Sequence, residues 1–301
     1  MGWNNPPVPW SKLERTLSGR PPEQDEVIHD PITIDHGDGG DTPSWTRGRP
    51  RYEAPDFIRE PSTVEYAELH CHSNFSFLDG ASHPEELAEE AIRLGLSGLA
   101  LTDHDGFYGV VRFSEAAQEL GLPTIFGAEL SLDLPGPQNG EPDPAGAHLL
   151  ALARGPAGYA RLSRVISEAQ LAGKEKGRPV YDLDQVAAEL REHVLVLTGC
   201  RKGLVPKALL TDGVAAAAWE LERLTKLFGE EHVAVELTDH GDPRDGERND
   251  DLTALAAQFG LRTVATNNVH YATPSRRPLA TALAALSPPQ SNASRDIAPL
   301  V

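Results

Sequence analysis

Two histidines separated by one residue stand in the most informative segment of this 301-residue chain, Glu68-Leu69-His70-Cys71-His72-Ser73. On a β-strand, residues two apart face the same side. His70 and His72 therefore point together, and Cys71 points away into the packing behind them. Imidazole pairs of this kind bind divalent metals. A single pair also arises by chance on protein surfaces, so it does not establish a metal site by itself.

Further ligand-type residues lie close to the ends of other predicted strands. Each one taken separately is explained as well by a buried polar residue satisfied by hydrogen bonds. Hydrogen bonds alone do not explain the whole group, because burying many ionisable side chains without compensation is costly. Divalent cations supply that compensation. The segments concerned are residues 101–105, 127–129, 148, 198–200 and 267–270.

Short apolar runs alternate with helical stretches from residue 66 onward, which predicts a parallel sheet with crossover helices. Strands are predicted at 66–70, 98–102, 124–130, 148–153, 194–198, 232–237 and 262–266, and helices at 84–94, 107–120, 158–170, 183–191, 204–210, 214–228 and 247–259. Only the link between the third and fourth strands lacks a helix. This series predicts a closed or nearly closed seven-stranded α/β barrel whose ligands lie at its catalytic end. A doubly wound open sheet is the alternative.

Four motifs resemble, in order, those of the polymerase and histidinol phosphatase (PHP) superfamily. They are the His-x-His-Ser opening, the Thr-Asp-His segment, the Gly-Ala-Glu strand and the final Asn-x-His-Tyr, and they fall within residues 65–275. Residues 70–81 and 101–109 are similar to the bacterial C-family replicative DNA polymerases, the DNA polymerase III alpha-subunit type. The long leader and residues 198–203 most resemble the error-prone, damage-tolerant branch of that family. The resemblance implies a distorted seven-stranded, TIM-like PHP barrel.

The resemblance also implies a set of metal ligands. In this sequence they are His70, His72, Asp79, His104, Glu129 as a bridging carboxylate, His148, Cys200, Asn268 and His270. Asn268 departs from the family pattern, which has Asp at that position. An amide brings no negative charge and cannot bridge two ions or act as a base as a carboxylate does. One metal site should therefore be weaker, and hydrolytic activity is in doubt.

Three further residues are candidates for support of the ligands or for contact with a phosphate. Asp103 precedes a ligand and could hold or polarise it. Arg201, next to Lys202, could contact a phosphate, or the two could be a solvated charge pair. Glu236 ends the sixth predicted strand and either orients a ligand or is only a carboxylate at the rim.

An intact cluster of two or three divalent ions would hydrolyse a phosphoester, because neighbouring ions lower the pKa of a shared water and hold the attacking and leaving oxygens. Zinc suits the imidazoles and Cys200, and manganese suits the carboxylates. In the polymerase family a body with magnesium-binding aspartates follows and transfers nucleotides. This chain lacks it, so nucleotidyl transfer by the chain alone is not expected.

The composition constrains the partners. The chain is 40% hydrophobic and 24% charged, with a formal net charge of -18. A stand-alone nucleic-acid binder normally has a basic face, so contact with DNA is expected through the full-length polymerase, with accessory translesion proteins or a sliding clamp as further partners. Neither a membrane span nor a signal peptide is predicted, which points to the cytoplasm. The two cysteines predict no disulfide framework.

Three regions are expected along the chain. Residues 1–64, about a quarter of them proline or glycine, predict a disordered leader in which Trp3, Trp10 and Trp45 could dock on a partner. Residues 65–275 form the barrel. Residues 276–301 are a truncated or aberrant tail, because residues 287–294 resemble neither helix nor barrel.

Three functions remain open. The first is the N-terminal PHP domain of an error-prone DNA polymerase that acts in translesion synthesis and DNA repair. The second is a free-standing phosphoesterase of the histidinol-phosphatase kind, which should turn over a small phosphomonoester. The third, compatible with the first, is a structural metal domain that docks a polymerase or accessory protein. Asn268 favours the third over the second.

Overall fold

The computed structural model describes residues 52–56, 58–59, 64–138, 146–286 and 298–300. Most of the predicted leader, and residues 287–294 of the predicted tail, lie outside these residues. The described part of the leader contains neither helix nor strand. The chain divides into two units, residues 1–53 and 54–301, and the fold described below belongs to the second.

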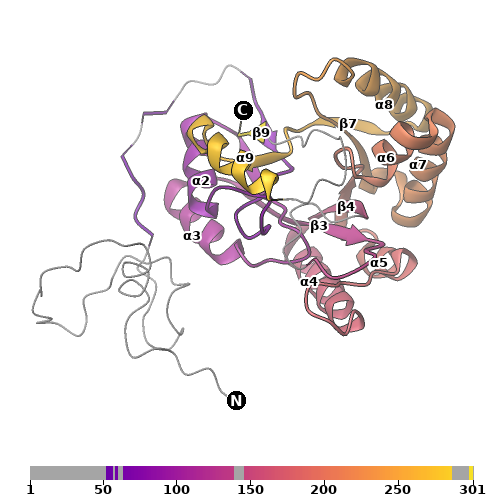
Figure 1. Ribbon diagram of the computed structural model, residues 1–301, viewed down its shortest axis with the longest axis horizontal. Coiled ribbons are helices and arrows are strands. Elements are labelled where there is room, and N and C mark those ends of the chain that lie inside the picture. The colour runs from indigo at the N-terminus through magenta and orange to yellow at the C-terminus, as the bar shows by residue number, and fades with distance from the viewer. Residues whose placement is uncertain (1–51, 57, 60–63, 139–145, 287–297, 301) are drawn as a thin grey trace, which may run out of the picture. The chain divides into compact units, whose positions relative to one another are not determined.

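Seven strands form one sheet in sequential order, β1 to β7; Figure 1 labels β3, β4 and β7 among them. They are Ala67–Glu68 (β1), Gly98–Leu101 (β2), Thr124–Leu132 (β3), Ala147–Ala153 (β4), Val194–Leu197 (β5), Val233–Leu237 (β6) and Arg262–Ala265 (β7). All neighbouring pairs are parallel except those of β4, which is antiparallel to both β3 and β5. The prediction of an entirely parallel series is therefore wrong at β4. The described part of the β3–β4 link holds no helix, and a direct link between neighbouring strands makes them antiparallel, whereas a parallel pair requires a crossover.

The sheet curls without pairing β7 to β1 in the part of the chain that the structure describes. The segment after β7 closes the gap at the carboxyl end of β1. The backbone N–H of Val269 donates to the carbonyl of His70, and the N–H of His72 donates to the carbonyl of Val269, each at 2.8 Å. This segment includes a short strand, β8 (Val269–Tyr271). The predicted barrel is thus a curled half-barrel, closed locally beside residues 70–72.

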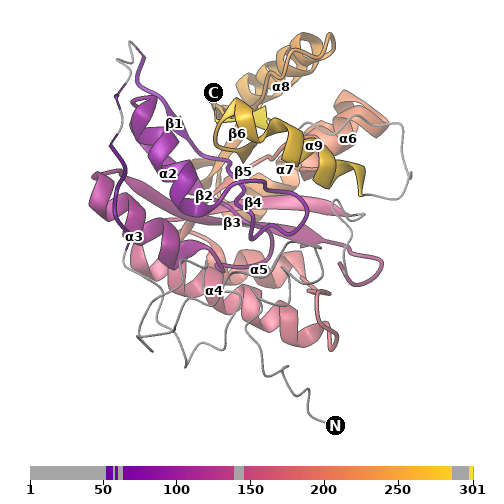
Figure 2. The same ribbon diagram turned by 60° about the vertical axis from the view of Figure 1, so that its left-hand side comes forward.

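Helices cover the outer face of the sheet. They are Pro84–Arg93 (α2), Val110–Leu120 (α3), Gly155–Ala172 (α4), Leu183–Leu190 (α5), Leu204–Asp212 (α6), Val214–Phe228 (α7) and Asp245–Phe259 (α8). Helices α4 and α5 run side by side against β3 and β4 (Figure 2). All seven predicted helices are present, with ends that differ by a few residues.

Alternation along β4 separates two hydrophobic clusters, because successive side chains of a strand face opposite sides. Leu149 and Ala151 pack outward against the helices, in a cluster that includes Leu162 of α4. Leu150 and Leu152 pack in a second cluster made only of residues from the strands and their immediate flanks. The curled sheet therefore has a packed inner face, and the polar side chains are left to its edge.

Part of the predicted tail is regular structure. A helix that was not predicted, α9 (Arg277–Ala285), follows the last barrel strand, and its Ala280 packs with Ala81 and Tyr271. A two-residue strand, β9 (Ala298–Pro299), pairs in parallel with β8. In the described part of the chain, no helix is both long and apolar enough to cross a membrane.

Candidate metal centre

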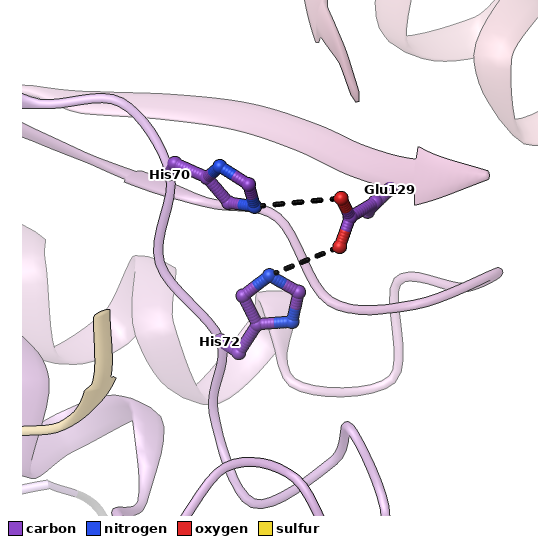
Figure 3. A group of neighbouring side chains, drawn as sticks. All are labelled: His70, His72 and Glu129. Carbon is purple, nitrogen blue, oxygen red and sulfur yellow. Dashed lines mark ion pairs between the residues drawn. The ribbon is translucent and has the colours of Figure 1, made fainter. Parts of the chain in front are cut away.

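His70 and His72 follow β1 and point toward the same carboxylate, that of Glu129 (Figure 3). The Nε2 atom of His70 lies 3.6 Å from Oε1 of Glu129, and the Nε2 atom of His72 lies 3.3 Å from Oε2. Backbone hydrogen bonds to Val269 hold this segment extended. Cys71 between them is fully buried.

Glu129 lies within β3, is buried, and is the carboxylate on which four imidazoles converge. Besides His70 and His72, Nε2 of His104 lies 3.5 Å away and Nδ1 of His148 lies 3.0 Å away. His148 is at the start of its strand, yet it reaches the edge where the other strands end. It does so because β4 runs antiparallel to its neighbours.

Asp79 forms the second carboxylate of the centre and comes from the loop after the first two histidines. Its oxygens lie 3.2 Å from Nδ1 of His72, 3.6 Å from Nε2 of His104 and 3.5 Å from Nε2 of His270. His270 is on β8, the strand that closes the gap beside residues 70–72. His72 and His104 therefore face both carboxylates.

The side chains fit divalent cations. Three overlapping groups have ligand atoms that all lie within 4.8 Å of one another: His70, His72 and Glu129; His72, Asp79 and His104; and His104, Glu129 and His148. Several of their buried nitrogen and oxygen atoms have no hydrogen-bond partner among the described residues, including Nε2 of His70 and of His72. Buried polar atoms are normally paired, so converging unpaired ligand atoms are what a cation site requires.

The ionisation of the centre also suits cations. Burial alone would raise the pKa of the Glu129 carboxyl, but His148 and His70 outweigh it and hold that pKa well below its usual range. Burial likewise opposes ionisation of Asp79, and His270, His104 and His72 hold its pKa well below the usual range. Burial lowers the pKa of His270 to about 4. Both carboxylates are therefore anionic at neutral pH, the form that metal ions bind.

The pattern of motifs and this geometry agree with a comparison to known families. A family model described as the PHP domain matches residues 68–240. This chain belongs to the PHP domain family.

Relatives of the PHP chain include long bacterial polymerases. A protein named Error-prone DNA polymerase from Mycolicibacterium paratuberculosis is 52% identical over 303 residues, covering 100% of this chain and 27% of the relative. One of the same name from Nocardia farcinica is 48% identical over 328 residues, covering 95% of this chain and 28% of the relative. The chain spans about a quarter of the length of these curated relatives.

A solved structure from Bifidobacterium adolescentis, assigned as a metal-dependent phosphoesterase, covers 70% of this chain and 89% of its own. It is 20% identical, with a TM-score of 0.48. A likeness at that level does not bear on function.

Two of the three candidate supporting residues touch the histidines of the PHP site or their partners. Oε1 of Glu236 lies 2.7 Å from Nδ1 of His70 and also accepts a hydrogen bond from Thr266. Asp103 accepts hydrogen bonds from the hydroxyls of Ser73 at 2.8 Å and Ser76 at 2.7 Å. Carboxylates of this kind fix the orientation of a ligating imidazole.

Sequence reasoning missed two residues of this network. Glu68 is buried and accepts hydrogen bonds from the Tyr66 hydroxyl at 2.6 Å, the His70 N–H at 2.8 Å and the Asn267 N–H at 2.9 Å. Burial raises its pKa to about 7, although these hydrogen bonds oppose the shift. Ser76 links Asp103 to His72, with its hydroxyl 3.3 Å from Nδ1. Glu68 lies two residues before His70, so the two side chains face the same side of the strand. This spacing is the sequence signal that could have identified Glu68.

Three predicted site residues remain: Cys200, Asn268 and Arg201. Cys200 is partly buried and is absent from the three groups of converging ligand atoms among the described residues. Burial, with Glu129 nearby, raises the pKa of its thiol to about 12. Asn268 is 5% exposed, and its Oδ1 has no hydrogen-bond partner among the described residues. Arg201 follows β5 and is partly buried.

Proposed function

We propose that this chain is the PHP module of an error-prone DNA polymerase and that it carries a phosphoesterase-type metal centre. The observation that carries the proposal is the convergence of four imidazoles on the buried carboxylate of Glu129. Identity of about one half along the whole chain to proteins named Error-prone DNA polymerase supports the polymerase context. In that context the partner is DNA, in the bacterial cytoplasm, with accessory translesion proteins or a sliding clamp.

The module would hold two or three divalent ions. Their ligands would be His70, His72, Asp79, His104, Glu129, His148, His270 and Cys200, with Asn268 contributing only an amide oxygen. Bound ions would supply a water of lowered pKa and positive charge toward a phosphate. The mixture of imidazoles and carboxylates suits zinc or manganese. Magnesium would belong to the polymerase body.

The chain's own residues would set the geometry of this centre. Glu236 holds the ring of His70 from behind, and Glu68 joins the segment of His70 to that of Asn267. Asp103 and Ser76 fix the loop that carries Asp79. Arg201 and Lys202, just past β5, would contact the phosphate.

Asn268 would weaken the site. Its backbone φ of 46° is left-handed, a conformation that Asn and Asp adopt more readily than most residues. A carboxylate would therefore fit the same backbone. We expect this module to bind metal and to hydrolyse phosphoesters weakly or not at all.

Elemental analysis of the purified, unchelated chain tests the metal centre. Two or three equivalents of zinc or manganese are expected, and less than half an equivalent would contradict the proposal. Assays with manganese and with zinc on a DNA 3′ end and on a small phosphomonoester test the rest. Robust hydrolysis that His104→Ala abolishes would show that Asn268 is no impediment, and a preference for the small substrate would favour a free-standing phosphatase.

A further inference from the structure

Two aromatic side chains are exposed on the two loops that carry Asp79 and His104. Phe77 is 71% exposed and Tyr108 is 64% exposed. Residues 70–83 and 98–110 are all described, and Phe77 and Tyr108 are the exposed residues of these two stretches. Neither side chain is part of the buried core, so both rings can contact a ligand from solvent.

The loop of Phe77 is tightly closed. The N–H groups of Asp79 and Gly80 both donate to the carbonyl of Ser76 at 3.0 Å. A Cβ on Gly80 would lie 2.0 Å from the carbonyl oxygen of Ser73, so the turn leaves no room for a side chain there. Leu78 has a left-handed φ of 63°, a strained conformation for a bulky residue. The turn thereby directs Asp79 into the centre and leaves Phe77 outside.

The ring of Tyr108 is held against the backbone two residues beyond His104. A Cβ on Gly106 would lie 2.1 Å from Cε2 of Tyr108, so the ring occupies the space that a side chain at position 106 would need. The ring is therefore placed by packing on one side and open to solvent on the other.

The two loops form one connected unit. A Cβ on Gly109 would lie 3.0 Å from the ring of Phe75 and 3.2 Å from Oγ of Ser73, so the loops are in van der Waals contact. The N–H of His104 also donates to Oγ of Ser76 at 3.2 Å. Phe77 and Tyr108 therefore lie on connected loops that also carry the proposed ligands Asp79 and His104.

We propose that Phe77 and Tyr108 form a stacking subsite for the nucleobase next to the phosphate that reaches the metal centre. The inference rests on the proposed function, and it names the ligand class as a single-stranded DNA end. Stacking on aromatic side chains is tolerant of sequence because every base has a π face. The net charge of -18 disfavours binding through the DNA backbone alone, so base contacts would carry much of the affinity.

Titration of the full chain with fluorescently labelled single-stranded oligonucleotides tests the subsite. A thymidine oligomer is compared with an abasic oligomer of the same length and charge, in the presence of Mn²⁺. The base-bearing oligomer should bind about tenfold more tightly, and Phe77→Ala or Tyr108→Ala should each reduce that preference several-fold. Affinity for the abasic oligomer should not change.

Two control variants accompany these measurements. Phe77→Trp keeps an aromatic face and should retain the preference. Trp219→Ala removes an aromatic side chain that is 59% exposed on α7 and should have no effect. Equal affinity of the wild-type chain for the two oligomers, or a preference unchanged in both alanine variants, would overturn the subsite.

Chelation separates this inference from the function on which it rests. Removing the metal should weaken both oligomers alike, because both lose the partner of the phosphate while the aromatic rings remain. If chelation changes neither affinity, the metal centre is not the phosphate site and the proposed function fails. In that case the difference in affinity between the base-bearing and the abasic oligomer still tests the stacking subsite.

Discussion

The two carboxylates of the centre belong to differently built parts of the molecule. Glu129 lies within a long strand, is fully buried, and its imidazoles come from the ends of neighbouring strands. Asp79 lies on a loop with its side chain 17% exposed, and its distinctive partner, His270, belongs to the segment that closes the sheet. Asn268, which the resemblance marks as an amide where an acid is expected, is on that closing segment. On the proposed ligand set, the half built on regular strands holds the more buried carboxylate, and the half built on loops includes this amide.

The largest effect is expected from removing ligands of the strand-built half. His70→Ala with His72→Ala should strip metal and lower the melting temperature by about 5–10 °C, since an ion that binds only the native state adds to the unfolding free energy. Elemental analysis and thermal unfolding, each with and without chelator, measure this. His193→Ala, at a partly buried histidine before β5, is the control. If chelator changes the melting temperature equally in the double variant and in the wild-type chain, the strand-built half is not the main metal-binding part of the centre.

Asn268→Asp should sharpen the comparison by adding a charge to the loop-built half. The new carboxylate and His270 are two residues apart, and a full charge replaces a dipole. Metal affinity and hydrolysis of a simple phosphoester or a DNA 3′ end should rise by about 10–100-fold. Gln118→Glu adds the same charge to the exposed face of α3 and should change neither. If Asn268→Asp leaves both quantities unchanged, the pocket lacks other catalytic elements as well.

Glu68→Gln should affect both halves moderately, because Glu68 bonds the segment of His70 to that of Asn267. The amide keeps the size of the side chain but has one acceptor oxygen in place of two for the three donors. The free energy of unfolding should fall by about 1–3 kcal/mol in denaturant titration. Glu65→Gln, at an exposed neighbour, should stay within about 0.5 kcal/mol of wild type. A similarly small change at Glu68 would show that the two halves are not coupled through it.

The smallest effect is expected from removing residues 1–60, which include none of the proposed ligands. Their composition has too few apolar residues to contribute a core, so the remaining chain should stay folded and keep its metal. Cooperative thermal unfolding and metal content of the truncated protein measure this. Insoluble protein, or the loss of cooperative unfolding, would indicate that Trp3, Trp10 or Trp45 packs into the folded unit.

The local pattern of this sequence determined the elements and the chemistry of the site. Apolar runs of strand length and helical stretches between them gave boundaries for seven strands and seven helices that differ from the structure by a few residues. Period-two spacing placed His70 and His72 on one face, and strand ends held the other ligand-type residues. These properties depend on near neighbours in the chain, so they can be read without the fold.

Only the tertiary structure decided which of those side chains meet. The antiparallel direction of β4 brings His148 to Glu129, and the pairing of Val269 with residues 70–72 brings His270 to Asp79. Glu236 reaches His70 across 166 positions of the chain. Such contacts depend on strand direction and on pairing between distant segments, which no local period encodes. The same reason explains why Ser76 was missed and why the local spacing of Glu68 was not enough: the fold shows that they join Asp103 and Asn267 to the segment of the first two histidines.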